Sequence, residues 1–176
     1  MRTLVVVLIA VVAFASGTML GFMLDDSDAD ASVPTATGGL PAAVEETRAR
    51  LLEAANTGDY EALRELIPES GFKYTFGDTV AGGPIAYWQE LERTTEPRPI
   101  EALATALQLP YVLARGYYVW PWAYALPSSD DLSPHERELL TPLGLPSELF
   151  PELAGYYGWR AGIAPDGRWV FFVAGD

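Results

Sequence analysis

Few side chains in this chain are suited to catalysis or to metal binding. It contains one histidine, His135, and no cysteine, which excludes a thiolate nucleophile, a disulfide and a zinc site rich in Cys or His. His135 falls in the first turn of a predicted helix, where it would face solvent. No HExxH, P-loop, GxSxG or GxGxxG motif occurs. The sequence therefore predicts no catalytic residue, no metal site and no cofactor.

Asp78 is the acidic candidate for a site. It ends the stretch GFKYTFGD, whose alternating pattern predicts a strand over residues 71–78 with Phe72, Tyr74 and Phe76 on one face. A carboxylate at the end of a strand can act as a general base where it is buried. It can equally cap the turn before the next helix, which is a common use of Asp.

Arg160 and Arg168 are candidate ligands for an anion, because both fall on one face of a predicted β-hairpin. The stretches GWRAGI and RWVFFVAGD flank residues 165–167, whose Pro, Asp and Gly favour a type I turn with a Gly bulge. The resulting register pairs Ile163 with Trp169, Ala161 with Phe171, and Trp159 with Val173. One face is then almost wholly apolar, and the face with the two arginines is partly open. The alternative is that both arginines form ion pairs on a solvated sheet face.

An aromatic run, YYVWPWAYALP, covers residues 117–127. In a continuous strand, alternation would place four large rings on one face, those of Tyr118, Trp120, Trp122 and Tyr124. Packing beneath helices would explain such a face, and so would a ring-lined pocket or a surface that contacts a protein or a glycan. Because Pro121 cannot donate to a sheet, the run should lie on an edge, at a bulge, or leave the sheet there.

Helical periodicity and cap residues precede these candidates along the chain. Helices are predicted over residues 44–59, 59–67, 82–94 and 100–109, and a Ser-Pro-His-Glu capping box starts another at Ser133 within a helical region between residues 130 and 151. Helices followed by antiparallel strands are typical of an α+β fold. The sequence therefore predicts N-terminal helices packed on a curved, mostly antiparallel sheet.

The stretches RLLEAANTGDYEALRELI, FKYTFGD and GWRAGIAPDGRWVFFVAGD together resemble the NTF2-like (SnoaL-like) superfamily. The resemblance covers residues 44–76 and 117–176, apart from the helical insertion. The chain departs from the family pattern where two helices separate the first two strands. The resemblance implies a conical sheet with a pocket between sheet and helices, which in that family serves enzymes, ligand-binding proteins and dimers.

The N-terminal part of the chain predicts a location. Residues 3–24 carry no charge and are long enough to cross a bilayer, with Arg2 before them and Asp25 and Asp26 after them. We predict a transmembrane anchor or signal segment over residues 1–24, a disordered acidic linker over 25–43 and an exported α+β domain over 44–176. The domain would be secreted if the segment is cleaved. A single lysine against ten arginines is typical of a GC-rich bacterial genome.

The net charge of the protein limits the kinds of molecule that it could bind. The formal net charge of −13 would repel nucleic acid, so we predict no nucleic-acid partner. The function that these observations favour is non-catalytic binding of a small ligand, an envelope component or a protein by a membrane-anchored bacterial domain. The ligand-binding candidates are Tyr118, Trp120, Trp122, Tyr124, Asp78, Arg160 and Arg168. The alternatives are a small pocket enzyme with Asp78 as base and a scaffold that forms a homodimer.

Overall fold

The computed structural model describes residues 39–151 and 155–175. The predicted anchor and most of the predicted linker lie outside the described residues. The helices are α1 (Ala42–Thr57), α2 (Tyr60–Leu66), α3 (Gly83–Leu91), α4 (Pro99–Gln108), α5 (Pro134–Leu140) and α6 (Pro146–Leu149), with 3-10 turns η1 (Trp122–Ala125), η2 (Ser129–Asp131) and η3 (Thr141–Leu143). The strands are β1 (Val112–Ala114), β2 (Tyr117–Trp120), β3 (Arg160–Ile163) and β4 (Trp169–Val173). In this part of the chain no helix combines the length and apolarity needed to cross a membrane.

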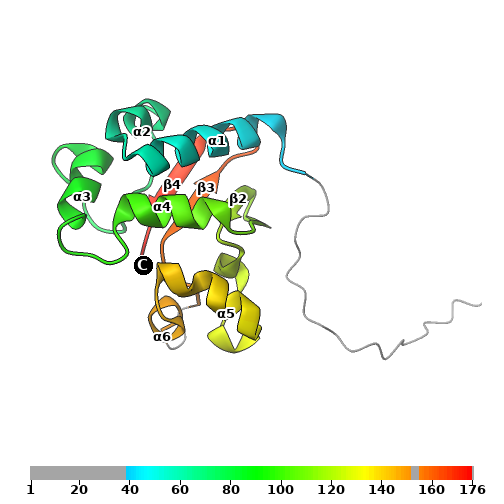
Figure 1. Cartoon of the computed structure of the whole chain (residues 1–176). Coiled ribbons are helices and arrows are strands. Elements are labelled where there is room, and N and C mark those ends of the chain that lie inside the picture. The colour runs from blue at the N-terminus through cyan, green and yellow to red at the C-terminus, as the bar shows by residue number, and fades with distance from the viewer. Residues whose placement is uncertain (1–38, 152–154, 176) are drawn as a thin grey trace, which may run out of the picture. The chain divides into compact units, whose positions relative to one another are not determined.

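The four strands form one antiparallel sheet in the order β1-β2-β3-β4. Helices α1 and α4 lie across one face of it, and α5 and α6 gather below α4 in the view of Figure 1. Two side chains of α1 fix this helix to the hairpin turn and to α4. Thr47 Oγ1 donates to the Gly167 carbonyl at 2.6 Å, and Arg48 Nε donates to the Leu107 carbonyl at 2.9 Å. The structure therefore confirms the predicted α+β class.

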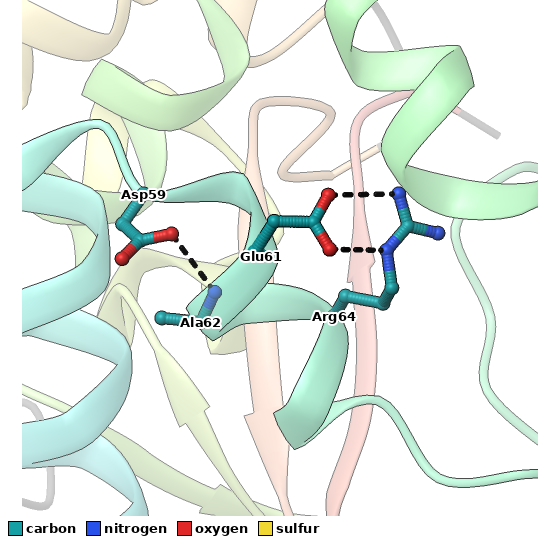
Figure 2. Close-up of polar contacts among 4 residues, drawn as sticks. All are labelled: Asp59, Glu61, Ala62 and Arg64. Atoms are coloured by element: carbon teal, nitrogen blue, oxygen red, sulfur yellow. Dashed lines mark hydrogen bonds and ion pairs between the residues drawn. The ribbon is translucent and has the colours of Figure 1, made fainter.

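Two helices begin at the cap residues that the sequence predicted. Asp59 caps α2 by accepting the Ala62 N–H at 3.0 Å, and Glu61 contacts Arg64 one turn later (Figure 2). A side-chain cap of this kind stabilises a helix by about 1 kcal/mol, and the exposed ion pair adds little. The predicted capping box at Ser133 also forms and starts α5. Local hydrogen bonding was enough to place these boundaries.

The core lies between the helices and the covered sheet face and is built largely from aromatic rings. Trp88 of α3 packs against Trp169 and Phe172 of β4, with ring centroids 5.7 and 5.4 Å apart. Trp159 stacks on Phe172 at 4.7 Å. Burial of such rings removes a large apolar area from water and supplies most of the favourable free energy of folding.

The strand predicted over residues 71–78 does not form. Only Lys73 pairs with the sheet, in an isolated parallel bridge to Phe171 at the outer edge of β4. Phe72 packs on Trp169 at 4.7 Å, whereas Phe76 is exposed, so the alternation of the sequence is not carried along one face. Because Lys73 forms the sole bridge of this segment, the chain is free to bend away after it.

The closing hairpin forms with the predicted turn but not with the predicted register. Ile163 pairs with Trp169 as expected, and the Ala164 N–H donates to the Arg168 carbonyl. A bulge at Val170 then shifts the pairing by one residue, so that Ala161 faces Phe172 and Gly162 faces Phe171. The predicted pairs Ala161–Phe171 and Trp159–Val173 are therefore wrong. Each residue of β4 after the bulge points to the face opposite the one that simple alternation assigned to it.

The aromatic run also departs from a continuous strand. Strand β2 ends at Trp120, and Pro121 is the N-cap of the 3-10 turn η1, which begins at Trp122. The prediction that four rings share one strand face is therefore wrong beyond Trp120, because the chain leaves the sheet at the proline. That departure is one of the three outcomes expected for a residue without an N–H donor.

We predict that Gly167→Ala destabilises the fold by about 3 kcal/mol in urea unfolding. Gly167 has a φ of +88°, and a Cβ there would lie 2.7 Å from the Ala43 carbonyl oxygen, at the junction of α1 and the hairpin. The matched control is Gly58→Ala, because Gly58 has a φ of +69° but open space around it. The control should lose about 1–2 kcal/mol. Equal losses in the two variants would contradict a close approach at Gly167.

Candidate functional site

A cleft of about 690 Å³ opens on the sheet face turned away from the core rings. Its floor is formed by Phe171 and Val173 of β4, which the bulge directs to this face. Its lining is Lys73, Thr75, Phe76, Gly77, Ala114, Arg115, Tyr124, Ala125, Leu126, Gly155, Tyr156, Arg160, Phe171 and Val173. The lining comes from five separate parts of the chain, so the folded sheet is needed to bring it together. A volume of this size suits a small organic molecule.

Gly162 allows one ring to lie flat on the cleft floor. A Cβ at this position would lie 2.2 Å from Cε1 of Phe171, the residue that pairs with Gly162 across β3 and β4. The Phe171 ring therefore covers the glycine and meets the Tyr117 ring edge-on, with centroids 6.3 Å apart. A glycine inside a strand often marks such a close approach. The result is an apolar, partly exposed aromatic surface.

Arg160 is held in the cleft wall by backbone and ring contacts. Its side chain donates to the Gly158 carbonyl at 3.1 Å and to the Gly175 carbonyl at 2.7 Å. Its guanidinium lies 5.3 Å from the centroid of the Phe76 ring and 5.8 Å from that of Tyr124. Arginine stacked in this way keeps its charge while its planar faces are covered by rings. Only 5% of the residue is exposed, so the Arg160 side chain is a buried part of the cleft wall.

Tyr156 adds a fixed hydroxyl to the wall. Its O–H donates to the Trp159 carbonyl at 3.1 Å. Burial raises the pKa of Tyr156, and the nearby charge of Arg160 offsets only part of that effect. The hydroxyl therefore stays protonated across the physiological range and serves as a hydrogen-bond donor.

The cleft is positive in a protein whose formal net charge is −13. Lys73, Arg115 and Arg160 line it, and no Asp or Glu occurs among its described lining residues. Arg115 and Gly116 form the two-residue turn between β1 and β2, with φ of +52° and +83°. This is the backbone of a type I′ turn, in which the first position usually carries Asn, Asp or Gly. An arginine there is unusual for the turn and places a cation at the cleft.

Two of the predicted binding residues, Tyr124 and Arg160, line the cleft together. Trp120 and Trp122 do not, because both are core residues with 1% and 2% of their surface exposed. Tyr118 is half-buried and packs beside Tyr111, with ring centroids 5.7 Å apart, on the core side of the sheet. Of the two readings of the aromatic run, burial favours core packing for the tryptophans.

Asp78 and Arg168 lie outside the described lining. Asp78 is exposed, so nothing in its surroundings resembles the buried setting of a general base. Arg168 is exposed at the hairpin turn, where its Nε lies 3.9 Å from Oδ2 of Asp166. The two arginines were predicted to share one open sheet face, but only Arg160 lines the cleft. Arg168 instead forms an exposed ion pair with Asp166, which was the alternative prediction.

Sequence reasoning missed Lys73 and Phe171, and it considered Arg115 as a candidate for a carboxylate or ring contact without including it among the ligand-binding residues. Lys73 was assigned to a strand that does not form, and Phe171 to the core face by a register that lacked the bulge. A signal for Arg115 was present, since an X-Gly pair between two β-prone stretches indicates a two-residue hairpin turn. No residue pattern in the hairpin marks the bulge at Val170.

A second hollow, of about 650 Å³, lies between α1 and α2. It is lined by Arg50, Glu53, Asp59 and Glu65 with small and apolar residues, so it has both charges and no aromatic ring. Across residues 39–151 and 155–175, no group of three or more His, Asp or Glu side chains is placed to hold a metal ion. The aromatic, positive cleft is therefore the better candidate site.

Comparison of the chain with protein-family models, with curated proteins and with solved structures finds no match in any of the three. The assignment of a function therefore depends on the geometry and charge of the cleft.

We predict that iodide quenches tryptophan fluorescence very weakly in the native protein. All five tryptophans, Trp88, Trp120, Trp122, Trp159 and Trp169, are buried with at most 7% exposed, so a charged quencher cannot reach them. Quenching should appear only after urea unfolding. Strong native quenching that Trp120→Phe or Trp122→Phe removes would contradict their placement in the core.

Proposed function

We propose that this domain is a non-catalytic binding protein for a small organic molecule, which it takes up in the cleft. The observation that carries the proposal is a ring-lined hollow of about 690 Å³ on a sheet face that the core helices leave uncovered. Phe76, Tyr124 and Phe171 present aromatic surface to it. A site of this kind binds through apolar contact and gains orientation from a few polar groups.

Binding fits the lining better than catalysis does. The described lining residues include no His, Asp, Glu or Cys, which are the usual general acids, bases and nucleophiles. The polar groups of Tyr156 and Arg160 are already engaged with backbone carbonyls. An enzyme with Asp78 as its base stays a hypothesis without support from the cleft. The homodimeric scaffold also stays a hypothesis, for which the exposed Leu113 on edge strand β1 is the relevant surface.

We further propose where the domain is located in the cell and to which superfamily it is related. Residues 3–24 support a single membrane anchor, with the α+β domain held outside a bacterial cell by the acidic linker. The order of helices followed by antiparallel strands supports a relationship to the NTF2-like superfamily. A protein of this kind would collect its ligand at the outer side of the membrane.

We predict that the purified domain binds a naphthyl dye at one site, with a Kd on the order of 1–100 µM. The test is a fluorescence titration with anionic anilinonaphthalene sulfonate and with neutral phenylnaphthylamine. Ala125→Phe should abolish binding, because Ala125 is exposed and lines the cleft, so the larger side chain fills it. The control Ala49→Phe changes an exposed residue of α1 and should leave binding intact. If neither dye binds, or if Ala125→Phe binds normally, the proposed function is wrong.

We predict that the full-length chain stays with the membrane fraction after a carbonate wash, and that protease added to intact spheroplasts removes the domain. The reason is the uncharged run at residues 3–24 with positive charge before it and negative charge after it. A chain without residues 1–24 is the matched control and should be protease-protected in the cytoplasm. A soluble full-length chain after export would contradict the anchor, and a protected domain would contradict the outside location.

A further inference from the structure

We propose that the ligand of the cleft is an organic anion, whose apolar body rests on the rings and whose negative charge is drawn to Lys73 and Arg115. This inference rests on the proposed function, because it names the chemical class of the molecule that the cleft binds. It follows from how the protein uses its few cations, from the backbone at Arg115 and from the division of the cleft into apolar and charged parts.

Five of the nine arginines in the described part of the chain form an ion pair that is local in sequence, whereas Arg50 and Arg137 form none. Arg48, Arg64, Arg93, Arg98 and Arg168 each form an ion pair with a Glu or Asp on a neighbouring stretch of chain. Lys73 and Arg115 are both exposed, and neither forms an ion pair within the described part of the chain. In a protein with 24 acidic residues against 11 basic ones, two unpaired cations at one cleft leave a local positive field.

The two cations reach the cleft from the two edges of the sheet. Arg115 is in the turn that follows edge strand β1, and Lys73 is bridged to β4 at the other edge. Both line the same hollow. An anion that enters would therefore meet positive charge on either side, without a carboxylate among the described lining residues to oppose it.

Arg115 occupies a backbone position that costs stability. A φ of +52° is unfavourable for a residue with a Cβ, and the type I′ turn would be better served by Asn or Gly. A strained residue at a cleft is a reason to look for a role of its side chain. The guanidinium can form paired hydrogen bonds to a carboxylate, phosphate or sulfonate.

The apolar body of the ligand has its own surface. Phe171 lies flat over Gly162, and the exposed ring of Phe76, which covers the Arg160 guanidinium, also lines the cleft. A planar apolar group placed against these rings would lose part of its hydration without burying a charge. A purely inorganic anion would leave this surface in water, so the cleft favours an anion with an organic part.

Two dyes with the same apolar frame test this division. Anilinonaphthalene sulfonate carries a sulfonate, and phenylnaphthylamine is its neutral counterpart. We expect the anionic dye to bind about tenfold more tightly than the neutral one at low salt, and we expect this preference to shrink as salt is raised. Equal affinity for the two dyes would overturn the anion inference while leaving the proposed function standing. Failure of both dyes to bind would overturn the proposed function itself.

Charge-removing variants locate the anion. Lys73→Gln and Arg115→Gln should each weaken the anionic dye by about threefold and leave the neutral dye unchanged. Arg50→Gln is the matched control, because it removes the same charge from the α1–α2 hollow and should change neither dye. Loss of affinity in either cleft variant supports the inference. Unchanged affinity in both, or an equal loss in Arg50→Gln, overturns it.

Arg115→Asn separates binding from folding. Asn suits the positive φ, so the melting temperature should rise by about 2–4 °C while the anionic dye weakens as it does in Arg115→Gln. A variant that gains stability and keeps full affinity would overturn the role of Arg115.

Displacement experiments identify which anionic group of a ligand the cleft prefers. Naphthoate and naphthyl phosphate, added as competitors of the anionic dye, distinguish a carboxylate from a phosphate, and displacement by either supports the inference. Inorganic phosphate at the same concentration should not displace the dye. Displacement by inorganic phosphate as strong as by the naphthyl compounds would overturn the requirement for an apolar body.

Discussion

The bulge at Val170 is the constraint on which both the core and the cleft depend. Without it, strict alternation along β4 would leave Phe172 on the open face and bring Phe171 into the core. With it, Trp169 and Phe172 both face the core rings, and Phe171 and Val173 form the cleft floor. The Val170 carbonyl also accepts the N–H of Lys73, so the same irregularity attaches the segment that carries a cleft cation. One extra residue in one strand therefore sets the contents of both faces.

The electrostatics of the cleft are opposite to those of the whole protein. A net charge of −13 favours solubility and repels anions at long range, so an anionic ligand must gain from local contacts and not from steering. A small molecule that reaches the cleft meets Lys73 and Arg115, whereas a large polyanion would also meet the acidic surface of the protein. Under the proposed function the ligand is a small molecule, and the absence of a nucleic-acid partner stays a prediction.

Local chemistry made the helices predictable. Asp59 as a cap, the Ser133 capping box and the Pro-Asp-Gly turn act within a few residues of themselves, and each formed as the sequence indicated. The site was harder to predict from the sequence, because its residues come together only when the sheet forms. Arg160 and Tyr124 were identified from their residue types, whereas Phe171 depended on the bulge and Lys73 on a single bridge to β4. Tertiary pairing that overrides alternation leaves no trace in a short stretch of sequence.

Chemical-shift mapping by NMR during titration with naphthoate tests the central claim most directly, because it reports where a small organic anion sits without altering any side chain. The account predicts that the largest shifts fall on residues of the cleft, above all Lys73, Arg115, Tyr124 and Phe171, and that they saturate with one ligand per chain. Shifts centred on the α1–α2 hollow around Arg50, or no saturable shifts at all, would contradict it.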